Sequence, residues 1–86
     1  MPVYKWNPLK SQRLKKARGA SFEEVLGGKF IELIDHPNRP EQKILLLWYQ
    51  NYVWAAPCIE TEGGIFLKTL YQCRKYTKMY KKGKWS

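Results

Sequence analysis

Two apolar runs in the middle of the 86-residue chain constrain its fold more than any other feature of the sequence. Residues 43–49 and 52–59 have the length of strands and are rich in the apolar and aromatic residues that strands favour. Their hydrophobicity is nearly continuous, which indicates strands buried on both faces at the centre of a sheet. Gln50 and Asn51 separate the runs and predict a tight two-residue hairpin. Pro57 predicts a bulge or an unpaired N–H position in the second strand.

Capping signals predict two helices before this hairpin. Asn7 is a good N-cap, and Pro8 suits the first helical position. Gly19 provides a left-handed stop, so the first helix should end at about Arg18. Residues 21–24 form a capping box that opens a short second helix. The apolar and basic residues of the first helix should lie on different sides, with Leu9, Leu14 and Ala17 on one side and Lys15, Lys16 and Arg18 facing away from it.

The remaining segments supply three more strands and a loop. We expect strands at residues 3–6, 30–35 and 65–71, and a loop at residues 36–41 that holds two prolines. Alternation in the second of these strands assigns its apolar residues to two faces, Ile31 and Leu33 to one and Phe30 and Ile34 to the other.

From Gln72 the pattern becomes helical. Cys73, Tyr76, Thr77 and Tyr80 fall on one side of this helix, and Arg74, Lys75, Lys78, Lys81 and Lys82 fall on the other. The order of elements predicts an α+β fold with two N-terminal helices, an antiparallel sheet of about four to five strands and a C-terminal helix. We expect one domain over residues 1–86, with a loose basic tail at residues 81–86.

Charge is the clearest indicator of function, because the net charge of +9 is concentrated at both ends. Residues 1–20 hold six Lys or Arg and no acid, and residues 68–86 hold seven and no acid. All seven acids lie in residues 21–67, beside three basic residues. Such a distribution favours a polyanionic partner, most simply a nucleic acid bound through salt-dependent phosphate contacts. A solvated basic surface and an acidic protein partner are the alternatives.

Other features narrow the cellular setting. The chain has no uninterrupted apolar stretch of about 18 residues and no apolar signal-peptide core near its start, so we expect a cytoplasmic protein without a membrane partner. Cys58 and Cys73 lack a metal-ligand spacing and are expected to be reduced, buried thiols.

No conventional catalytic set is visible in the sequence. The chain has one histidine, no glycine-rich phosphate loop and no cluster of acids typical of a magnesium-dependent nuclease. We therefore expect no cofactor and no metal. If the protein cleaves RNA, the 2′-hydroxyl would attack its own phosphate while cationic and phenolic side chains stabilise charge and transfer protons.

Two cations are the first candidates for this chemistry. Lys68 interrupts the apolar strand at residues 65–71, on the face expected for Phe66 and Leu70, and a solubilising lysine at a strand edge is the alternative. Arg74 begins the last helix and can reach back toward that strand. Its planar guanidinium suits two-point binding of phosphate, and a generic basic helix face is the alternative.

Tyr80 and His36 complete the candidate catalytic set. Tyr80, like Tyr71 and Tyr76, carries a phenol that can donate a proton or stack on a base, although the helical pattern of Tyr76 and Tyr80 favours core-facing anchors. His36 is a candidate acid, but its His-Pro-Asn setting favours turn chemistry. For RNA binding we expect five cations on the two basic helices: Lys15, Arg18, Lys75, Lys78 and Lys81.

Two segments, residues 5–25 and 65–80, resemble the two ends of BrnT-type toxins of the RelE/ParE superfamily. Residues 5–25, KWNPLKSQRLKKARGASFEEV, resemble their opening turn, basic helix and Gly-Val-Ser-Phe-Glu-Glu step, with Ala20 in place of Val. Residues 65–80, IFLKTLYQCRKYTKMY, resemble their closing strand and helix, with Cys73 in place of Ser and Tyr76 in place of Ala. Arg74, Lys75, Thr77 and Tyr80 occupy matching places, and His36-Pro37-Asn38 resembles a loop of a BrnT-like subgroup.

The resemblance implies a RelE-like fold and an endoribonuclease that cleaves mRNA and arrests growth. It implies neutralisation by a cognate antitoxin, often of the ribbon-helix-helix type, and leaves open a role for the ribosome. It assigns Arg74 as the best catalytic position and Lys68 as its strand neighbour. Two other readings remain open on the same charge pattern: a non-catalytic module that binds RNA, ribosomes or DNA, and a subunit that only binds an acidic protein.

Overall fold

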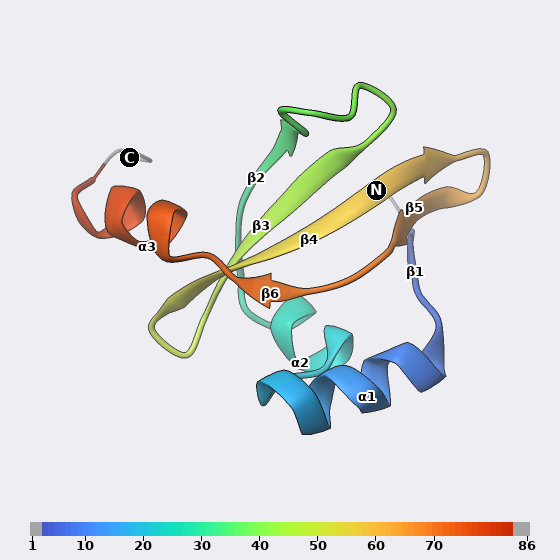
Figure 1. Cartoon of the computed structure of the whole chain (residues 1–86), viewed down its shortest axis with the longest axis horizontal. Coiled ribbons are helices and arrows are strands. Elements are labelled where there is room, and N and C mark those ends of the chain that lie inside the picture. The colour runs from blue at the N-terminus through green and yellow to red at the C-terminus, as the bar shows by residue number, and fades with distance from the viewer. Residues whose placement is uncertain (1–2, 84–86) are drawn as a thin grey trace.

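A computed structural model, which describes residues 3–83, has an α+β architecture built on one mixed sheet (Figure 1). The elements along the chain are β1 (Tyr4–Lys5), α1 (Pro8–Arg18), α2 (Phe22–Leu26), β2 (Lys29–Asp35), β3 (Lys43–Tyr49), β4 (Tyr52–Thr61), β5 (Gly64–Leu67), β6 (Tyr71–Gln72) and α3 (Arg74–Lys81). The predicted α+β class with two N-terminal helices and a C-terminal helix is confirmed. Of the tail predicted at residues 81–86, Lys81 is the last residue of α3 and Lys82 is its C-cap, and residues 84–86 lie outside the described residues.

The sheet has six strands in the order β1-β5-β4-β3-β2, and β6 also pairs with β4. Paired strands are antiparallel except β1 and β5, which are parallel. The sheet exceeds the expected four to five strands because the predicted last strand is divided into β5 and β6. β3 and β4 form the predicted hairpin, in which Gln50 and Asn51 have φ angles of 50° and 63°. Two positive φ angles are typical of a type I′ turn, whose twist matches that of the flanking strands.

Both faces of the sheet are covered, which explains why β3 is apolar without interruption. Leu45 and Leu47 point to the face that carries α1 and α2, which we call the α1–α2 face, and Ile44 and Leu46 point to the α3 face. In Figure 1, α1 and α2 lie together and apart from α3. The core of the α1–α2 face consists of Leu14, Ala20, Phe22, Val25, Leu45, Leu47, Trp54, Ala56, Cys58, Ile65, Leu67 and Leu70. The smaller core of the α3 face consists of Ile44, Leu46, Val53 and Ala55, with Tyr71, Cys73, Tyr76 and Tyr80 packed against it.

An irregularity in β2 changes the predicted faces of that strand. The pairing of β2 with β3 shifts register between Phe30 and Glu32. Ile31 therefore packs on the α3 face, whereas Leu33 packs on the α1–α2 face. The prediction that Ile31 and Leu33 share a face is wrong, because simple alternation fails across a bulge.

Helix α1 meets α2 through a serine as well as through a leucine. Leu14 is buried, but Leu9 is 61% exposed and Ala17 is also exposed, so the predicted apolar side of α1 is only partly correct. Ser11 is 2% exposed instead. Its Oγ donates a hydrogen bond to Glu23 and accepts one from the Phe22 N–H at 3.0 Å. A polar joint of this kind cannot be seen in an apolar pattern.

The predicted strand at residues 65–71 breaks at Lys68, and Pro57 in β4 explains the break. The Lys68 N–H donates to the Pro57 carbonyl at 2.8 Å, which continues the register of β4 with β5. The opposite residue of such an antiparallel pair normally returns the bond through its own N–H, and proline has none. β5 therefore ends at Leu67, and the irregularity predicted at Pro57 is confirmed.

One extra residue lies between β5 and β6. Cys58 pairs with Leu67 in the register of β5, whereas Ala55 pairs with Tyr71 in the register of β6. This offset is that of a β-bulge, and it reverses the faces that successive side chains meet. Leu67 and Leu70 consequently lie in the same core, although they are three positions apart.

Candidate nucleic-acid interface

Helix α3 is fixed to β4 through the hydroxyl group of Thr77, which is 4% exposed. Thr77 Oγ1 accepts a hydrogen bond from the Val53 N–H at 2.9 Å and donates one to the Cys73 carbonyl at 2.6 Å. The Cys73 N–H in turn donates to the Val53 carbonyl at 2.8 Å. The hydroxyl thus stands between an N–H and a C=O that would pair directly if β6 continued. The chain can therefore leave the sheet and begin a helix without leaving a buried polar group unpaired.

The side of α3 that faces away from the sheet is basic, as predicted. Its exposed residues are Arg74, Lys75, Lys78, Lys81 and, just beyond the helix, Lys82. The ion pairs recorded within residues 3–83 involve Lys15 and Lys43 only, so no cation of α3 has a carboxylate partner there. Lys75 Nζ lies 5.8 Å from the centroid of the Tyr76 ring. An uncompensated row of cations attracts polyanions and favours phosphate contacts.

The basic residues of α1 are placed differently, because two of them are already engaged. Lys15 forms a 2.8 Å ion pair with Glu24, and Arg18 donates a hydrogen bond to the Leu70 carbonyl. The hydrogen bond with Glu24 raises the pKa of Lys15, and the same bond lowers the pKa of Glu24. α1 also lies across the sheet from α3. Of the five cations predicted to bind RNA, only the three on α3 therefore form one free surface: Lys75, Lys78 and Lys81.

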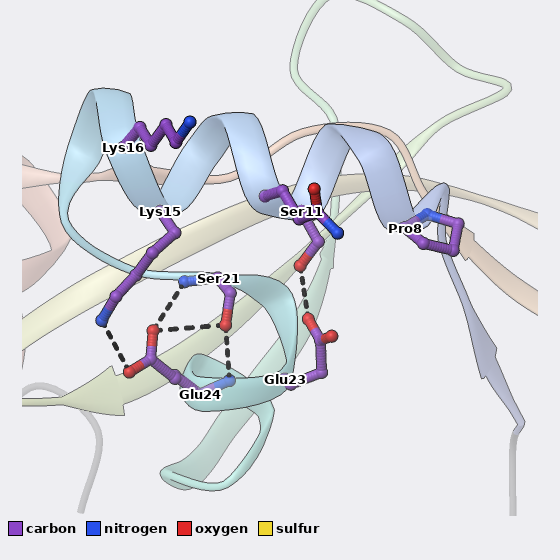
Figure 2. A pocket seen from close by; sticks show the side chains of 8 residues that line it. Pro8, Ser11, Lys15, Lys16, Ser21, Glu23 and Glu24 are labelled. Carbon is purple, nitrogen blue, oxygen red and sulfur yellow. Dashed lines mark hydrogen bonds and ion pairs between the residues drawn. The ribbon is translucent and has the colours of Figure 1, made fainter.

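The depression between α1 and α2 has a volume of about 450 Å³ and is crossed by hydrogen bonds (Figure 2). Lys15 points down to Glu24, whose carboxylate also bonds with Ser21, and Ser11 points to Glu23. The full lining is Pro8, Ser11, Gln12, Lys15, Lys16, Ser21, Glu23 and Glu24. Because both carboxylates are already bonded to neighbours, this arrangement joins the two helices and offers no free acid for chemistry.

Lys68 and Arg74 are both exposed. Since Leu67 points into the core of the α1–α2 face, strand alternation directs Lys68 to the α3 face. Leu70 lies on the opposite face, so the expectation that Lys68 and Leu70 share a face is wrong. The Lys68 N–H bonds to Pro57 of β4, and the N–H of Cys73, the residue before Arg74, bonds to Val53 of the same strand. Pro57 and Val53 are four residues apart, roughly 13 Å along the strand.

The two other candidate catalytic residues do not join this pair. Tyr80 lies six residues after Arg74, roughly 9 Å along α3, and belongs to the packed side of the helix. His36 follows β2 at the end of the sheet where Asp35 pairs with Lys43. Tyr80 stacks on Trp48, and Trp48 lies five residues, or roughly 16 Å, along β3 from Lys43, the residue that pairs at the His36 end of β2. The His36 Nδ1 accepts the Asn38 N–H at 3.1 Å, which is turn chemistry.

Tyr71, one of the three tyrosines that the sequence offers as proton donors, packs on the α3 face and lies between Lys68 and Arg74 in the chain. Burial, followed by the neighbouring Cys73 and Tyr76, raises the pKa of Tyr71. A tyrosine is protonated at neutral pH, and the raised pKa makes this phenol a weaker acid than an ordinary one. Its place between both candidate cations in the chain is the signal that distinguishes Tyr71 from Tyr76 and Tyr80.

Several other predictions concern groups away from this surface. Both cysteines are free thiols, but the prediction that both are buried holds only for Cys58, because Cys73 is half-buried and packs against the core of the α3 face. Burial raises the pKa of the Cys58 thiol. Among the described residues, no three His, Cys, Asp or Glu side chains are grouped so that they can hold a metal ion. No helix in residues 3–83 is both long and apolar enough to span a membrane.

Comparison with known proteins gives one informative likeness. No protein-family model and no curated protein sequence matches the chain. The fold is similar to that of BrnT, a ribonuclease toxin of Brucella abortus, with a TM-score of 0.55 and 12% sequence identity. The likeness covers 85% of this chain and 97% of the BrnT chain. The chain therefore has a BrnT-like α+β fold, as the resemblance at its two ends implied.

Proposed function

We propose that this protein is an endoribonuclease toxin that cleaves mRNA and is neutralised by a cognate antitoxin protein. The observation that carries the proposal is the row of unpaired cations on α3, set on the fold of a known ribonuclease toxin. RNA phosphates would bind along this row, and their contribution to affinity would decrease as salt increases. The α1 cations contribute less, because Lys15 and Arg18 already have partners within the chain.

In the proposed reaction the 2′-oxygen of one nucleotide attacks the adjacent phosphorus. The 2′-hydroxyl proton passes to a base, the bond from phosphorus to the 5′-oxygen breaks, and an acid protonates that leaving oxygen. Arg74 stabilises the charge that develops on the phosphate, and Lys68 assists from the neighbouring strand end. The phenol of Tyr71 is the proton donor on the same face, whereas Tyr80 lies further along α3 and is not used in this reaction. His36 is too far from Tyr80 to share one site with it.

The partners follow from the same proposal. The antitoxin would be a separate protein, of the ribbon-helix-helix type common beside BrnT-like toxins, and the ribosome is a second surface on which mRNA could be met. We place the protein in the cytoplasm, where its substrate is found. The basic α3 surface would then be covered by the antitoxin or occupied by RNA.

A non-catalytic nucleic-acid-binding module is the second candidate. The specific observation that favours it is the separation of the four residues predicted to be catalytic, which do not form one cluster. Such a module needs the cations of α3 and no proton transfer. It would bind RNA with the same salt dependence and leave it intact.

Cleavage of a labelled RNA by purified protein distinguishes the two candidates. Arg74→Ala should reduce the cleavage rate by about 10²-fold or more while binding changes little. Arg74→Lys should also fail, because a point charge does not reproduce the two-point grip of a guanidinium group. Lys68→Ala should give a smaller loss. Arg13→Ala is the matched control, since Arg13 is an exposed arginine of α1.

The proposal is contradicted if the parent protein binds RNA without cutting it. The assigned site is wrong if Arg74→Ala and Lys68→Ala both cut at the parental rate. Expression in a cell without the antitoxin gives the cellular counterpart, in which the parent should arrest growth and the Arg74→Ala variant should be tolerated.

A further inference from the structure

Two aromatic rings meet where the end of α3 lies over the β3–β4 hairpin. Trp48 and Tyr80 stack with their centroids 4.8 Å apart and their planes inclined by 29°. Both residues are half-buried, and both pack against the core of the α3 face. Trp48 belongs to a central strand of the sheet, and Tyr80 belongs to the helix that covers this face.

The ring pair is held in place before any ligand arrives. Trp48 is one residue from the end of β3 and is paired with Val53 across the hairpin. Tyr80 belongs to the helix that Thr77 hydrogen-bonds to Val53. Because both supports converge on β4, a ligand that contacts the rings does not have to order them first, which lowers the cost of binding.

Two exposed cations share the last turn of α3 with Tyr80, and neither is neutralised. Lys78 precedes Tyr80 by two residues and Lys81 follows it directly, and both lie on the side of α3 that faces away from the sheet. Neither has a carboxylate partner in the part of the chain that the structure describes. Open aromatic surface next to free cations is the combination with which proteins bind single-stranded nucleic acid: the rings stack on bases, and the cations contact the backbone.

A second aromatic pair in the molecule shows that this combination is not a general property of its rings. Tyr49 and Trp54 meet edge to face on the α1–α2 face, with centroids 6.4 Å apart. The cation near Tyr49 is Lys15, and that lysine is already paired with Glu24. Of these two pairs, only the one on the α3 face shares its element with cations that have no carboxylate partner among the described residues.

We propose that Trp48 and Tyr80 form a stacking platform for one unpaired base of a single-stranded RNA whose phosphates bind Lys78 and Lys81. The inference rests on the proposed function and names the form of RNA that its surface selects. A duplex keeps its base faces stacked inside the helix, so it would meet the cations and not the platform.

Two uncleavable probes of equal length test the platform. One is an oligodeoxythymidine of about eight nucleotides, within the site sizes of single-strand binders, and the other is a chain of the same length with the bases removed. Neither has the 2′-hydroxyl that the proposed reaction uses. The measurement is the Kd for each probe by fluorescence anisotropy at low salt, and the quantity compared is the ratio of the two Kd values within one protein preparation.

The parent should bind the probe with bases about 5- to 150-fold more tightly than the abasic probe, the range for stacking of one base. Tyr80→Leu should reduce this ratio at least 5-fold, and Tyr80→Phe should preserve it because the ring remains. Lys78→Ala and Lys81→Ala should raise the Kd for both probes by the same factor and leave the ratio of the two Kd values unchanged. Tyr49→Leu is the matched control on the other face and should also leave it unchanged. Because any unfolded fraction weakens both probes alike, poor folding of a variant cannot imitate the expected result.

The outcomes separate this inference from the proposed function. A parental ratio near one with tight, salt-dependent binding, or a ratio unaffected by Tyr80→Leu, overturns the platform and leaves the nuclease proposal standing. Failure of the parent to bind either probe removes the platform and counts against nucleic-acid binding itself. A ratio lost in both Tyr80→Leu and Tyr80→Phe also overturns it, because the hydroxyl group and not the ring would then be responsible.

Discussion

Replacing Thr77 by valine tests how α3 is held on the sheet. Valine has nearly the same shape as threonine but cannot accept the Val53 N–H or donate to the Cys73 carbonyl. The Cys73 carbonyl keeps a partner, because the Thr77 backbone N–H also donates to it at 3.0 Å. Within residues 3–83 the Val53 N–H has no such second partner. The substitution therefore leaves one buried donor unsatisfied.

The expected cost follows from that count. An unsatisfied buried donor lowers the free energy of unfolding by about 1 to 3 kcal/mol. For a chain of this size that corresponds to a decrease in Tm of roughly 4 to 24 °C. Thr77→Ser keeps the hydroxyl and removes one methyl group, so it should cost no more than about 0.8 kcal/mol. The polar variant should thus be the more stable of the two, although a hydrophobicity argument at a 4% exposed position predicts the reverse.

Urea unfolding followed by circular dichroism measures these differences. The midpoint should fall for Thr77→Val while the slope m stays constant, since the compactness of the folded state is retained. Lys78→Ala is the matched control at the adjacent exposed position and should change stability by less than about 0.5 kcal/mol. If Thr77→Val is as stable as the parent, the hydrogen bonds of the Thr77 hydroxyl do not stabilise the junction between β6 and α3.

Three further predictions concern other parts of the molecule. Arg18→Ala should lower the thermal midpoint and slow RNA cleavage, because the Leu70 carbonyl at the bulge loses its donor and the nearby Lys68 is less well positioned. Arg18→Lys should recover part of the lost stability and part of the lost cleavage rate. Acid should weaken the Lys15–Glu24 pair, because the pKa of Glu24 is lowered in the folded state. The stabilisation that Glu24 contributes is present above the ordinary glutamate pKa and is lost as pH falls through the lowered pKa. The Tm difference between the parent and Glu24→Gln should therefore shrink from pH 7 to pH 3. RNA cleavage should persist in EDTA, and its abolition would contradict the proposed metal-free reaction.

Much of the fold could be predicted because the relevant signals are local. The caps of α1 and α2, the Gln50–Asn51 turn and the two sides of α3 are each determined within a few residues. The errors come where a distant residue decides. Pro57 ends β5 across the sheet, and the bulge in β2 reverses the face of Ile31. Neither event leaves a mark in the alternation of its own strand.

The candidate site was less predictable for the same reason. The free charge of Lys75 and Lys78 follows from the helical pattern, but the engagement of Arg18 depends on a carbonyl 52 residues away. Lys15 likewise depends on a carboxylate of the next helix, α2. Helical periodicity tells which way a side chain points and does not tell what it meets.

The order in which strands pair has a consequence for how the protein is made. β2, β3, β4 and β5 are successive in the chain and adjacent in the sheet, so most of the sheet can form from nearby segments soon after they leave the ribosome. The basic surface cannot, because α3 is synthesised after all of them and Thr77 must then reach back to Val53. In this order the strands can pair before α3 docks on them, so the basic surface is the last part of the described fold to form.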